Sequence, residues 1–276
     1  MGYDLHIHSK ISDGTQTVAE LVQEISGTGL EGFALTDHDT TAGWKEAAEC
    51  AATAGLDFIP GMEISCSHAG RSVHLLSYLH DPTYVPLLEE IGKARASRVN
   101  RAQLMVERLS EDFPITWENV QEQTGEGATV GRPHIADALV VAGVVSTRSE
   151  AFASILTPQS RYYVSHYAVS PIDAVRLVRE AGGVPIIAHP RARSRGRVIT
   201  EETLETMIDA GLAGLEIYHR DNSTEDRAWL LQLAQRRNLL ITGSSDYHGT
   251  GKPNHLGENT TDRDTVARIR EQAVTH

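Results

Sequence analysis

The feature that most restricts the fold is an alternation of short apolar segments with segments of helical periodicity. Apolar runs typical of buried strands occupy residues 32–36, 184–188, 214–218 and 239–243. The sequence around them predicts helices over 42–54, 201–210, 224–236 and 262–273, and a capping box at residues 17–20 predicts the start of another. Further strands are expected at 3–8, 57–60 and 73–78, and the short link at Gly70 predicts that the last of these pairs closely with the strand that leads to Glu63. About seven strands, connected largely by helices, favour parallel pairing and a closed or distorted α/β barrel.

An inserted helical subdomain is expected after Asp81-Pro82, where the alternation stops. Residues 86–165 have helical periodicity, with an apolar stripe formed by Val99, Ala102, Met105, Val106 and Leu109. The first strand-like run after it is Tyr162-Tyr163-Val164. We therefore expect residues 1–85 and 166–276 to form the barrel and residues 86–165 to form the subdomain.

The composition narrows the class of protein. A chain of 276 residues, 40% of them hydrophobic, can bury a large core, and no run approaches the roughly eighteen apolar residues of a membrane span. The N-terminus leads directly into a strand and not into a secretory leader, so a cytoplasmic location is expected. Cys50 and Cys66 fit no zinc motif and exclude a disulfide framework. The net charge of −12 has the wrong sign for holding long nucleic acid through a general field.

Residues with nitrogen and oxygen donors follow the predicted strands. His6 and His8 are two residues apart and therefore share one face of the first strand. The others are Asp13, His38, Glu63, His74, His189, Asp246 and His248. The carboxyl ends of barrel strands meet at one rim, so we expect these side chains to form a single site. The structural alternative is a set of separate hydrogen-bonded polar residues at the strand ends.

These residue types are the ones that hold pairs of divalent cations. Glu63 can bridge two ions with its two oxygens, and neutral imidazoles suit zinc, iron or manganese. Two ions roughly 3.5–4 Å apart can lower the pKa of a shared water and stabilise the entering and leaving oxygens of a phosphoryl displacement. The pattern therefore predicts a metal-dependent phosphoesterase. We expect Glu63, Asp246 and His189 to act at its catalytic centre.

The motifs resemble those of the PHP (polymerase and histidinol phosphatase) family of metallophosphoesterases. They are His6 with His8, Ser12-Asp13-Gly14, Thr36-Asp37-His38-Asp39, Gly61-Met62-Glu63-Ile64, His74, Ala188-His189-Pro190 and Asp246-Tyr247-His248-Gly249. The resemblance implies a distorted (β/α)7 barrel with up to three metal ions. It assigns the first ion to His6, His8, Glu63 and Asp246, the second to Glu63, His74 and His189, and the third to Asp13, His38 and His248.

The element Gly131-Arg132-Pro133-His134 is similar to one found in the branch of this family that carries a helical insertion. Members of that branch hydrolyse nucleoside 3',5'-bisphosphates, and some remove nucleotides from the 5' end of short RNA. The resemblance implies that the insertion covers the site and that Arg132 and His134 contact substrate. Arg98 is a further candidate, because a guanidinium group binds phosphate bidentately. His134 could instead cap a helix.

Other charged residues near the predicted site have two interpretations. Asp37 and Asp39 could orient His38 or could be solvated turn residues. Arg95 and Arg101 are expected on a solvated helix face. A solvated loop at 191–197 is favoured over a site contact for Arg191 and Arg193, and a plain turn explains the glycines near Lys252. A structural role is favoured for His219 over proton donation to a leaving group.

The leading hypothesis is a phosphatase for small nucleotides or 5'-phosphorylated short RNA, in which hydroxide activated by the metal ions attacks in line. One alternative is a phosphatase for another small phosphomonoester, such as histidinol phosphate. A metal-dependent amidohydrolase also begins with His-x-His, but it usually bridges its metals with a carbamylated lysine, whereas Glu63 has that place here. A catalytically inactive nucleotide- and metal-binding module is the non-enzymatic alternative. The sequence leaves the metal identity and the oligomeric state open.

Overall fold

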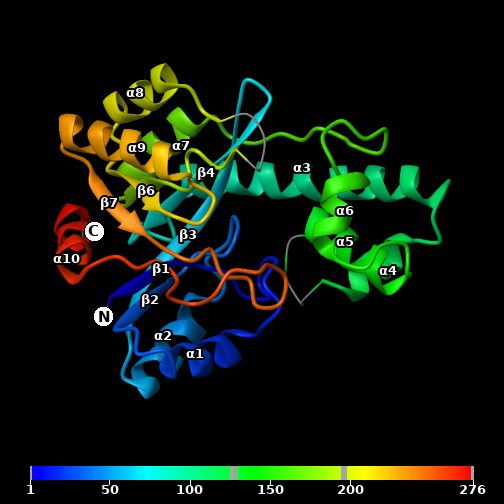
Figure 1. The fold of residues 1–276 in the computed structure, drawn as a ribbon, viewed down its shortest axis with the longest axis horizontal. Coiled ribbons are helices and arrows are strands. Elements are labelled where there is room, and N and C mark those ends of the chain that lie inside the picture. Colours follow the sequence, from blue (N-terminus) through cyan, green and yellow to red (C-terminus); the bar gives the residue numbers. More distant parts are fainter. Residues whose placement is uncertain (1, 125–127, 129, 194–197, 275–276) are drawn as a thin grey trace.

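A seven-stranded sheet forms the centre of the molecule in a computed structural model that describes residues 2–124, 128, 130–193 and 198–274 (Figure 1). Its strands follow one another in chain order: β1 (Tyr3–Ile7), β2 (Gly32–Leu35), β3 (Asp57–His68), β4 (Arg71–Tyr78), β5 (Val184–Ile187), β6 (Gly214–Tyr218) and β7 (Leu240–Gly243). The segment after β7 returns to β1, where the amide of His8 donates to the carbonyl of Tyr247 at 2.9 Å. The sheet is therefore a nearly closed barrel, as the sequence predicts.

The strand pairing is parallel except around β4. Strand β3 pairs with β4 as an antiparallel hairpin from Gly61↔Tyr78 to His68↔Arg71, and β4 pairs antiparallel with β5. The pairs β1–β2, β2–β3, β5–β6 and β6–β7 are parallel. The parallel pairing expected for strands separated by helices does not extend to β4, because the two-residue connection at Ala69-Gly70 is too short for a crossover. The antiparallel strand is what distorts the barrel.

Helices cover the outside of the barrel. They are α1 (Val18–Ser26), α2 (Trp44–Ala54), α7 (Pro171–Glu180), α8 (Glu201–Asp209), α9 (Thr224–Arg237) and α10 (Arg263–Gln272). Each helix turns an apolar stripe inward, as Leu21 and Ile25 of α1 do against Phe33 of β2. The capping box of α1 is present, since the Thr17 side chain accepts from the amide of Glu20.

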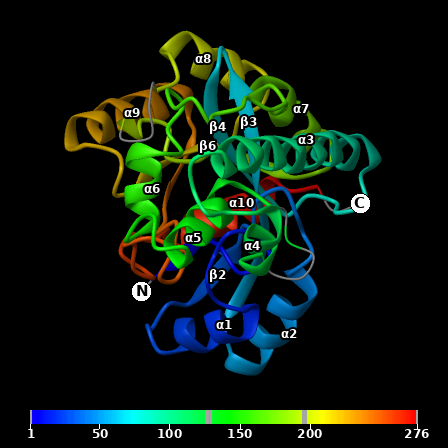
Figure 2. The ribbon, with the colours of Figure 1, turned by 90° about the vertical axis from the view of Figure 1, so that its right-hand side faces the viewer.

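Four helices lie between β4 and α7: α3 (Val85–Ser110), α4 (Trp117–Glu122), α5 (Arg132–Val141) and α6 (Arg148–Ser154). They enclose a separate apolar core that includes Met105, Leu109, Ile135 and Leu139. The first half of α3 packs Leu87 and Ile91 against the barrel core instead. This single helix, about 39 Å long at 1.5 Å per residue, connects the two cores. Figure 2 shows α4, α5 and α6 in front of the barrel, at one end of the sheet.

Two details differ from the sequence-based expectation. Residues 162–164 form no strand; Tyr162 and Val164 pack against the core of the helical insertion instead. Strand β3 continues well beyond Pro60 to His68, because it pairs along its length with β4. Glu63 therefore lies within a strand and not in a loop after one. Within the described part of the chain, no helix is both long and apolar enough to cross a membrane.

Candidate metal centre

The residues predicted from six separate segments lie together at the carboxyl ends of the barrel strands. His6 is on β1 and His8 directly follows it, while Glu63 is in the middle of β3 and His74 in β4. His189 follows β5, and Asp246 and His248 follow β7. All nine predicted donor residues have at least one partner within the cluster at less than 4 Å.

The first group surrounds Glu63. Its Oε2 lies 3.1 Å from His6 Nε2 and 3.0 Å from His8 Nε2. Oδ1 of Asp246 lies 3.4 Å and 3.5 Å from the same two nitrogens. One donor atom from each of these four residues falls within 4.8 Å of all the others, and the four residues are buried. This is the set that the resemblance assigns to the first ion.

The other carboxylate oxygen of Glu63 faces a second group. Oε1 lies 2.7 Å from His74 Nδ1 and 3.3 Å from His189 Nε2. The two oxygens of one carboxylate thus point at two different sets of imidazoles. That is the geometry a bridging carboxylate requires. His38 is shared between groups, since its Nδ1 lies 3.3 Å from Glu63 Oε2.

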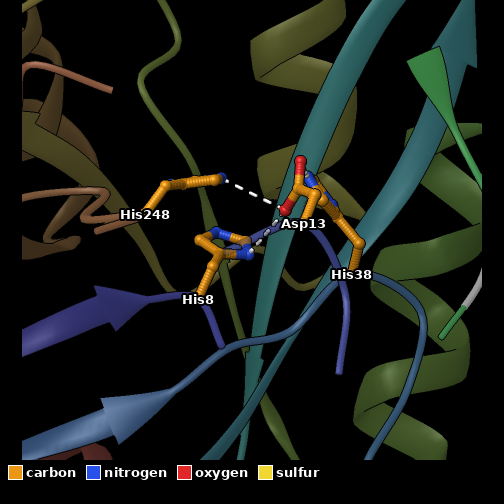
Figure 3. A group of neighbouring side chains, drawn as sticks. All are labelled: His8, Asp13, His38 and His248. Atoms are coloured by element: carbon orange, nitrogen blue, oxygen red, sulfur yellow. Dashed lines mark ion pairs between the residues drawn. The ribbon is translucent and has the colours of Figure 1, made fainter. Parts of the chain in front are cut away.

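A third group gathers around Asp13 (Figure 3). Oδ1 of Asp13 lies 3.2 Å from His248 Nε2 and 3.6 Å from His8 Nδ1, and Oδ2 lies 3.8 Å from His38 Nε2. His8 therefore faces the first group with one ring nitrogen and this group with the other. The set contains the three residues expected for a third ion and adds His8 to them.

The buried polar atoms at the centre fit cations. Within the described residues, several donor atoms are buried without hydrogen-bond geometry to any partner: His6 Nε2, His8 Nε2, His38 Nδ1, His248 Nε2 and Glu63 Oε2. Leaving such atoms unsatisfied is costly unless a ligand completes them. Imidazole nitrogens and carboxylate oxygens are the donors that zinc, manganese and iron accept.

Burial and neighbouring charges shift the pKa values of these side chains. Burial lowers the pKa of His248 to about 4, so its ring is in the neutral form that binds metal at pH 7. Burial would also lower the pKa of His8, but Asp246 and Glu63 raise it to about 9. Burial would raise the pKa of Glu63, but the imidazoles of His6, His38 and His74 hold it well below its ordinary range. A carboxylate kept anionic among imidazoles is ready to hold a cation.

Glu216 of β6 is a site residue that the sequence analysis missed. It is fully buried, and its Oε1 lies 2.9 Å from His6 Nδ1, while its Oε2 accepts from the amide of His189 at 2.7 Å. It thereby fixes the ring of His6 and the backbone of His189. The available signal was a carboxylate within the apolar strand Gly214-Leu-Glu-Ile-Tyr218, where an unpaired charge would be costly.

Asp37 and Asp39 are buried, so the interpretation as solvated turn residues was wrong. Neither has a hydrogen bond to His38 among those the structure shows. Asp37 accepts from the Ser9 amide at 2.8 Å and from Ser12 Oγ at 2.6 Å, which holds the loop that carries Asp13. Asp39 accepts from the Ser65 amide at 2.8 Å and from Arg98 Nη2 at 2.6 Å.

Further basic side chains lie at the rim of the barrel. Lys252 Nζ is 2.9 Å from Asp246 Oδ2, so this lysine reaches the metal centre and does more than close a turn. His219 is fully buried, with Nε2 3.5 Å from the same oxygen. Arg191 and Arg193 pair with Asp226 of α9 at 2.9 Å and 2.8 Å, which favours a structural role for them. The remainder of the predicted loop 191–197, residues 194–197, lies outside the described residues.

The candidate phosphate-binding arginines come together on the helical insertion. Arg98 bonds to Asp39 and Ser65, and the guanidinium group of Arg132 stacks 5.3 Å from the Phe152 ring and 5.8 Å from the Tyr163 ring. Arg101 is only 6% exposed, so its assignment to a solvated face was wrong. The outer half of α3 is covered by the rest of the insertion, which the helical periodicity alone does not reveal.

His134 is buried, and its Nδ1 accepts from the amide of Gly131 at 3.0 Å. It therefore caps its own helix, the alternative that the sequence left open. A contact of His134 with substrate stays a prediction.

Comparison with known proteins agrees with this arrangement. The PHP domain matches residues 4–123. A 3',5'-nucleoside bisphosphate phosphatase from Chromobacterium violaceum is 32% identical over 266 residues, which cover 96% of this chain and 93% of the relative. A phosphoribosyl 1,2-cyclic phosphate 1,2-diphosphodiesterase from Eggerthella lenta is 30% identical and covers 92% of this chain and 97% of the relative. A 5'-3' exoribonuclease from Haemophilus influenzae is 30% identical, with 98% of both chains covered.

A solved structure is similar to this chain in fold as well as in sequence. A crystal structure from Bifidobacterium adolescentis, assigned as a metal-dependent phosphoesterase, superposes with a TM-score of 0.97 at 47% identity and covers 100% of this chain and 97% of that one. The similarity extends over the whole length of this chain, with the barrel and the helical insertion both included. The chain belongs to the PHP-domain family of metal-dependent phosphoesterases.

Proposed function

We propose that the chain is a phosphatase that holds two to three divalent ions and acts on nucleotides carrying two phosphate groups. His6, His8, Glu63 and Asp246 hold the first ion, and Glu63, His74 and His189 hold the second. Asp13, His38 and His248, with His8 beside them, hold the third. Manganese, zinc and iron all suit these donors.

When bound, the ions supply Lewis acidity, which lowers the pKa of water and offsets the charge of the reacting phosphate. The chain supplies the positions. Glu63 would contribute one carboxylate oxygen to each of the first two ions, while Glu216 orients His6 and Asp37 orients the loop before Asp13. His189 and Asp246 complete the catalytic centre with Glu63. Lys252 reaches the same rim and can hold an anionic leaving group.

The observation that carries the substrate class is a group of three largely shielded arginines, of which only Arg98 has a carboxylate partner among the described residues. Arg98 pairs with Asp39. Within the described residues, no carboxylate lies within ion-pair distance of Arg101 or Arg132, and burial with Arg98 nearby lowers the pKa of both. Burial, with Arg132 and Arg98 nearby, lowers the pKa of Arg101 to about 9, which still leaves a cation at pH 7. Buried cations that repel one another call for an anion.

His166 completes this anion site. Arg101 Nη1 lies 3.0 Å from His166 Nδ1, so the arginine donates to a neutral imidazole. Burial and the three nearby arginines lower the pKa of His166 to about 3, which keeps the ring neutral at pH 7. Its Nε2–H then remains as a donor. Arg101, Arg132 and His166 together offer several donors to one tetrahedral anion.

The anion site lies next to the metal centre. Arg98 bonds to Ser65, which is two residues after Glu63 and therefore on the same face of β3, about 6.6 Å further along. Ser65 is also the cross-strand partner of His74. A substrate whose second phosphate lies one sugar away from the first can thus occupy both places. Nucleoside 3',5'-bisphosphates have this form, and so does the 5' end of a phosphorylated short RNA.

The names of the relatives support this assignment, since one is a 3',5'-nucleoside bisphosphate phosphatase and another a 5'-3' exoribonuclease. In this proposal, residues 86–165 cover the site, and residues 1–85 together with residues 166–276 form the barrel. His134, within residues 86–165, is a further candidate for contact with substrate. Cys50 and Cys66 are unpaired, which fits a reducing compartment such as the cytoplasm.

A substrate panel tests the proposal. Adenosine 3',5'-bisphosphate, adenosine 5'-monophosphate, histidinol phosphate and a 5'-phosphorylated oligoribonucleotide are compared with added Mn²⁺, Zn²⁺ or Fe²⁺. We expect release of phosphate from the bisphosphate, or of nucleotides from the oligonucleotide, at a kcat/KM well above that for histidinol phosphate. Preference for histidinol phosphate would favour the alternative phosphatase. Nucleotide binding with no turnover under any metal would indicate an inactive binding module.

A further inference from the structure

The helical insertion is joined to the barrel through Arg148, the first residue of α6. Its Nε and Nη2 donate to the two carboxylate oxygens of Asp137 on α5, each at 2.5 Å. The side chains are 13% and 25% exposed, so the pair is largely shielded from water. A bidentate pair of this kind fixes the plane of the guanidinium group. The third nitrogen is therefore aimed in a defined direction.

That nitrogen, Nη1, donates to the backbone carbonyl of Asp13 at 3.0 Å. Asp13 lies in a short turn after β1, in which the amides of Ser12 and Gly14 both donate to the carbonyl of Ser9. The carboxylate of Asp13 faces His8, His38 and His248 (Figure 3). The insertion thus holds the backbone of a residue whose side chain belongs to the third group of donors.

The same guanidinium group also packs against the loop that follows His248. A Cβ at Gly251 would lie 2.4 Å from Arg148 Nη1, so a larger residue there would displace the guanidinium group from its present position. The two loops are tied to each other by Thr15, whose amide donates to the carbonyl of His248 at 3.2 Å and whose Oγ1 accepts from the Thr250 amide at 2.9 Å. Arg148 therefore contacts two of the loops that supply donors to the third group, the loop of Asp13 and the loop after His248.

We propose that Arg148, held by Asp137, is a positioning residue for the third cation, so that retention of this ion depends on docking of the helical insertion. The inference rests on the proposed metal centre but not on any substrate. Contacts that orient a ligand residue without touching the metal contribute about 10–100-fold to metal affinity. Because linkage is reciprocal, the ion also favours the docked insertion by the same factor.

Titration of the metal-free protein with Mn²⁺, with the free ion measured by electron paramagnetic resonance, tests this proposal. We expect Arg148→Met to weaken the most weakly bound ion about 10–100-fold and to leave the tighter ions unchanged. Asp137→Asn should act in the same direction, and Arg148→Lys should restore part of the affinity because it keeps a donor near the Asp13 carbonyl. Arg236→Met is the matched control, since Arg236 is 55% exposed and pairs with Glu201 on the outside of the barrel.

A double-mutant cycle identifies the ion. Asp13→Asn removes a ligand directly, so adding Arg148→Met to it should cause no further loss if both act on one site. Additive losses would overturn the proposal, and so would wild-type affinity in both Arg148→Met and Asp137→Asn. The proposal would also be overturned if Asp13→Asn weakened none of the ions that the wild-type protein binds. Circular dichroism shows whether each variant folds. If Arg148→Met does not fold, the same titrations are made with Asp137→Asn in its place. Since no substrate is present, failure of the proposed nucleotide activity would leave this result unaffected.

Discussion

Replacing Arg101 with methionine tests whether the buried arginines bind a second phosphate. Methionine has a similar length and fills the space of the alkyl chain, but it removes the charge and the hydrogen bond to His166. A hydrogen bond to a charged group contributes about 1.5–3 kcal/mol, which corresponds to about 10–150-fold in kcat/KM. We expect this loss with adenosine 3',5'-bisphosphate. With adenosine 5'-monophosphate, which has no second phosphate, the change should stay within about 2-fold.

Stability should change in the opposite direction. In the free protein, Arg101 is 6% exposed, has no carboxylate partner among the described residues and lies beside two other arginines. Replacing buried charged groups with apolar ones often raises the free energy of unfolding by about 1–4 kcal/mol. The lost hydrogen bond to His166 offsets about 1 kcal/mol of this. Arg101→Met should therefore melt at or above the wild-type temperature.

The assay combines steady-state kinetics on both nucleotides with thermal denaturation, and Arg236→Met serves as the control for loss of an exposed arginine. Lower activity on the bisphosphate together with a higher melting temperature would show that Arg101 serves substrate binding and not stability. Equal losses on both substrates, together with a lower melting temperature, would show that Arg101 supports the fold and would refute the assignment of the anion site.

Three further predictions concern the metal centre and one buried histidine. Glu63→Gln should lower phosphatase activity by at least about 10³-fold and reduce the bound metal measured by elemental analysis, because an amide cannot bridge two cations; full activity in this variant would contradict the site. Glu216→Gln should weaken metal binding about 10–100-fold while leaving the fold intact, since only the orientation of His6 and His189 is disturbed; equilibrium dialysis measures it. His80 is buried and its pKa is lowered by burial to about 4, below the unfolded value near 6.5, so its contribution to stability is lost as the pH falls from 6.5 to 4, by roughly 3 kcal/mol. His80→Asn should remove this part of the acid sensitivity in urea unfolding, and an unchanged pH dependence would show that His80 is not its source.

The sequence predicted well which donor residues lie together, because these residues follow local rules. His6 and His8 share a face by strand periodicity, and His189 and Asp246 follow apolar runs whose carboxyl ends must meet in a barrel. These relations need only the strand positions and the order of elements. Glu216 obeys neither rule in an obvious way, since it lies inside a strand and contacts His6, 210 residues away in the sequence. Long-range partners of this kind depend on the barrel closing, which periodicity does not specify.

The helical insertion was predicted less well for the same reason. The apolar stripe of α3 predicts which side is buried, but Arg101 is buried beside Arg132 of α5 and His166 of the segment before α7. The assignment of Arg101 to solvent follows from treating α3 as an isolated amphipathic helix. The antiparallel β3–β4 hairpin shows the opposite case, since the short connection at Gly70 was enough to predict close pairing.

Several features of the proposed site lower the stability of the protein in the absence of a ligand. Asp39, His189 and Asp246 have φ of 53°, 31° and 54°, a region that costs non-glycine residues about 1–3 kcal/mol each. Like-charged arginines and unsatisfied imidazole nitrogens add to this cost. A ligand that binds only the folded state offsets it by about 2.7 kcal/mol per site at one hundred times its Kd, or roughly 5–10 °C in melting temperature for a chain of this size. Mn²⁺ should therefore raise the melting temperature of the wild type by at least this amount and that of Glu63→Gln by much less; equal shifts in both would mean that the ion stabilises the protein from somewhere other than the strand ends.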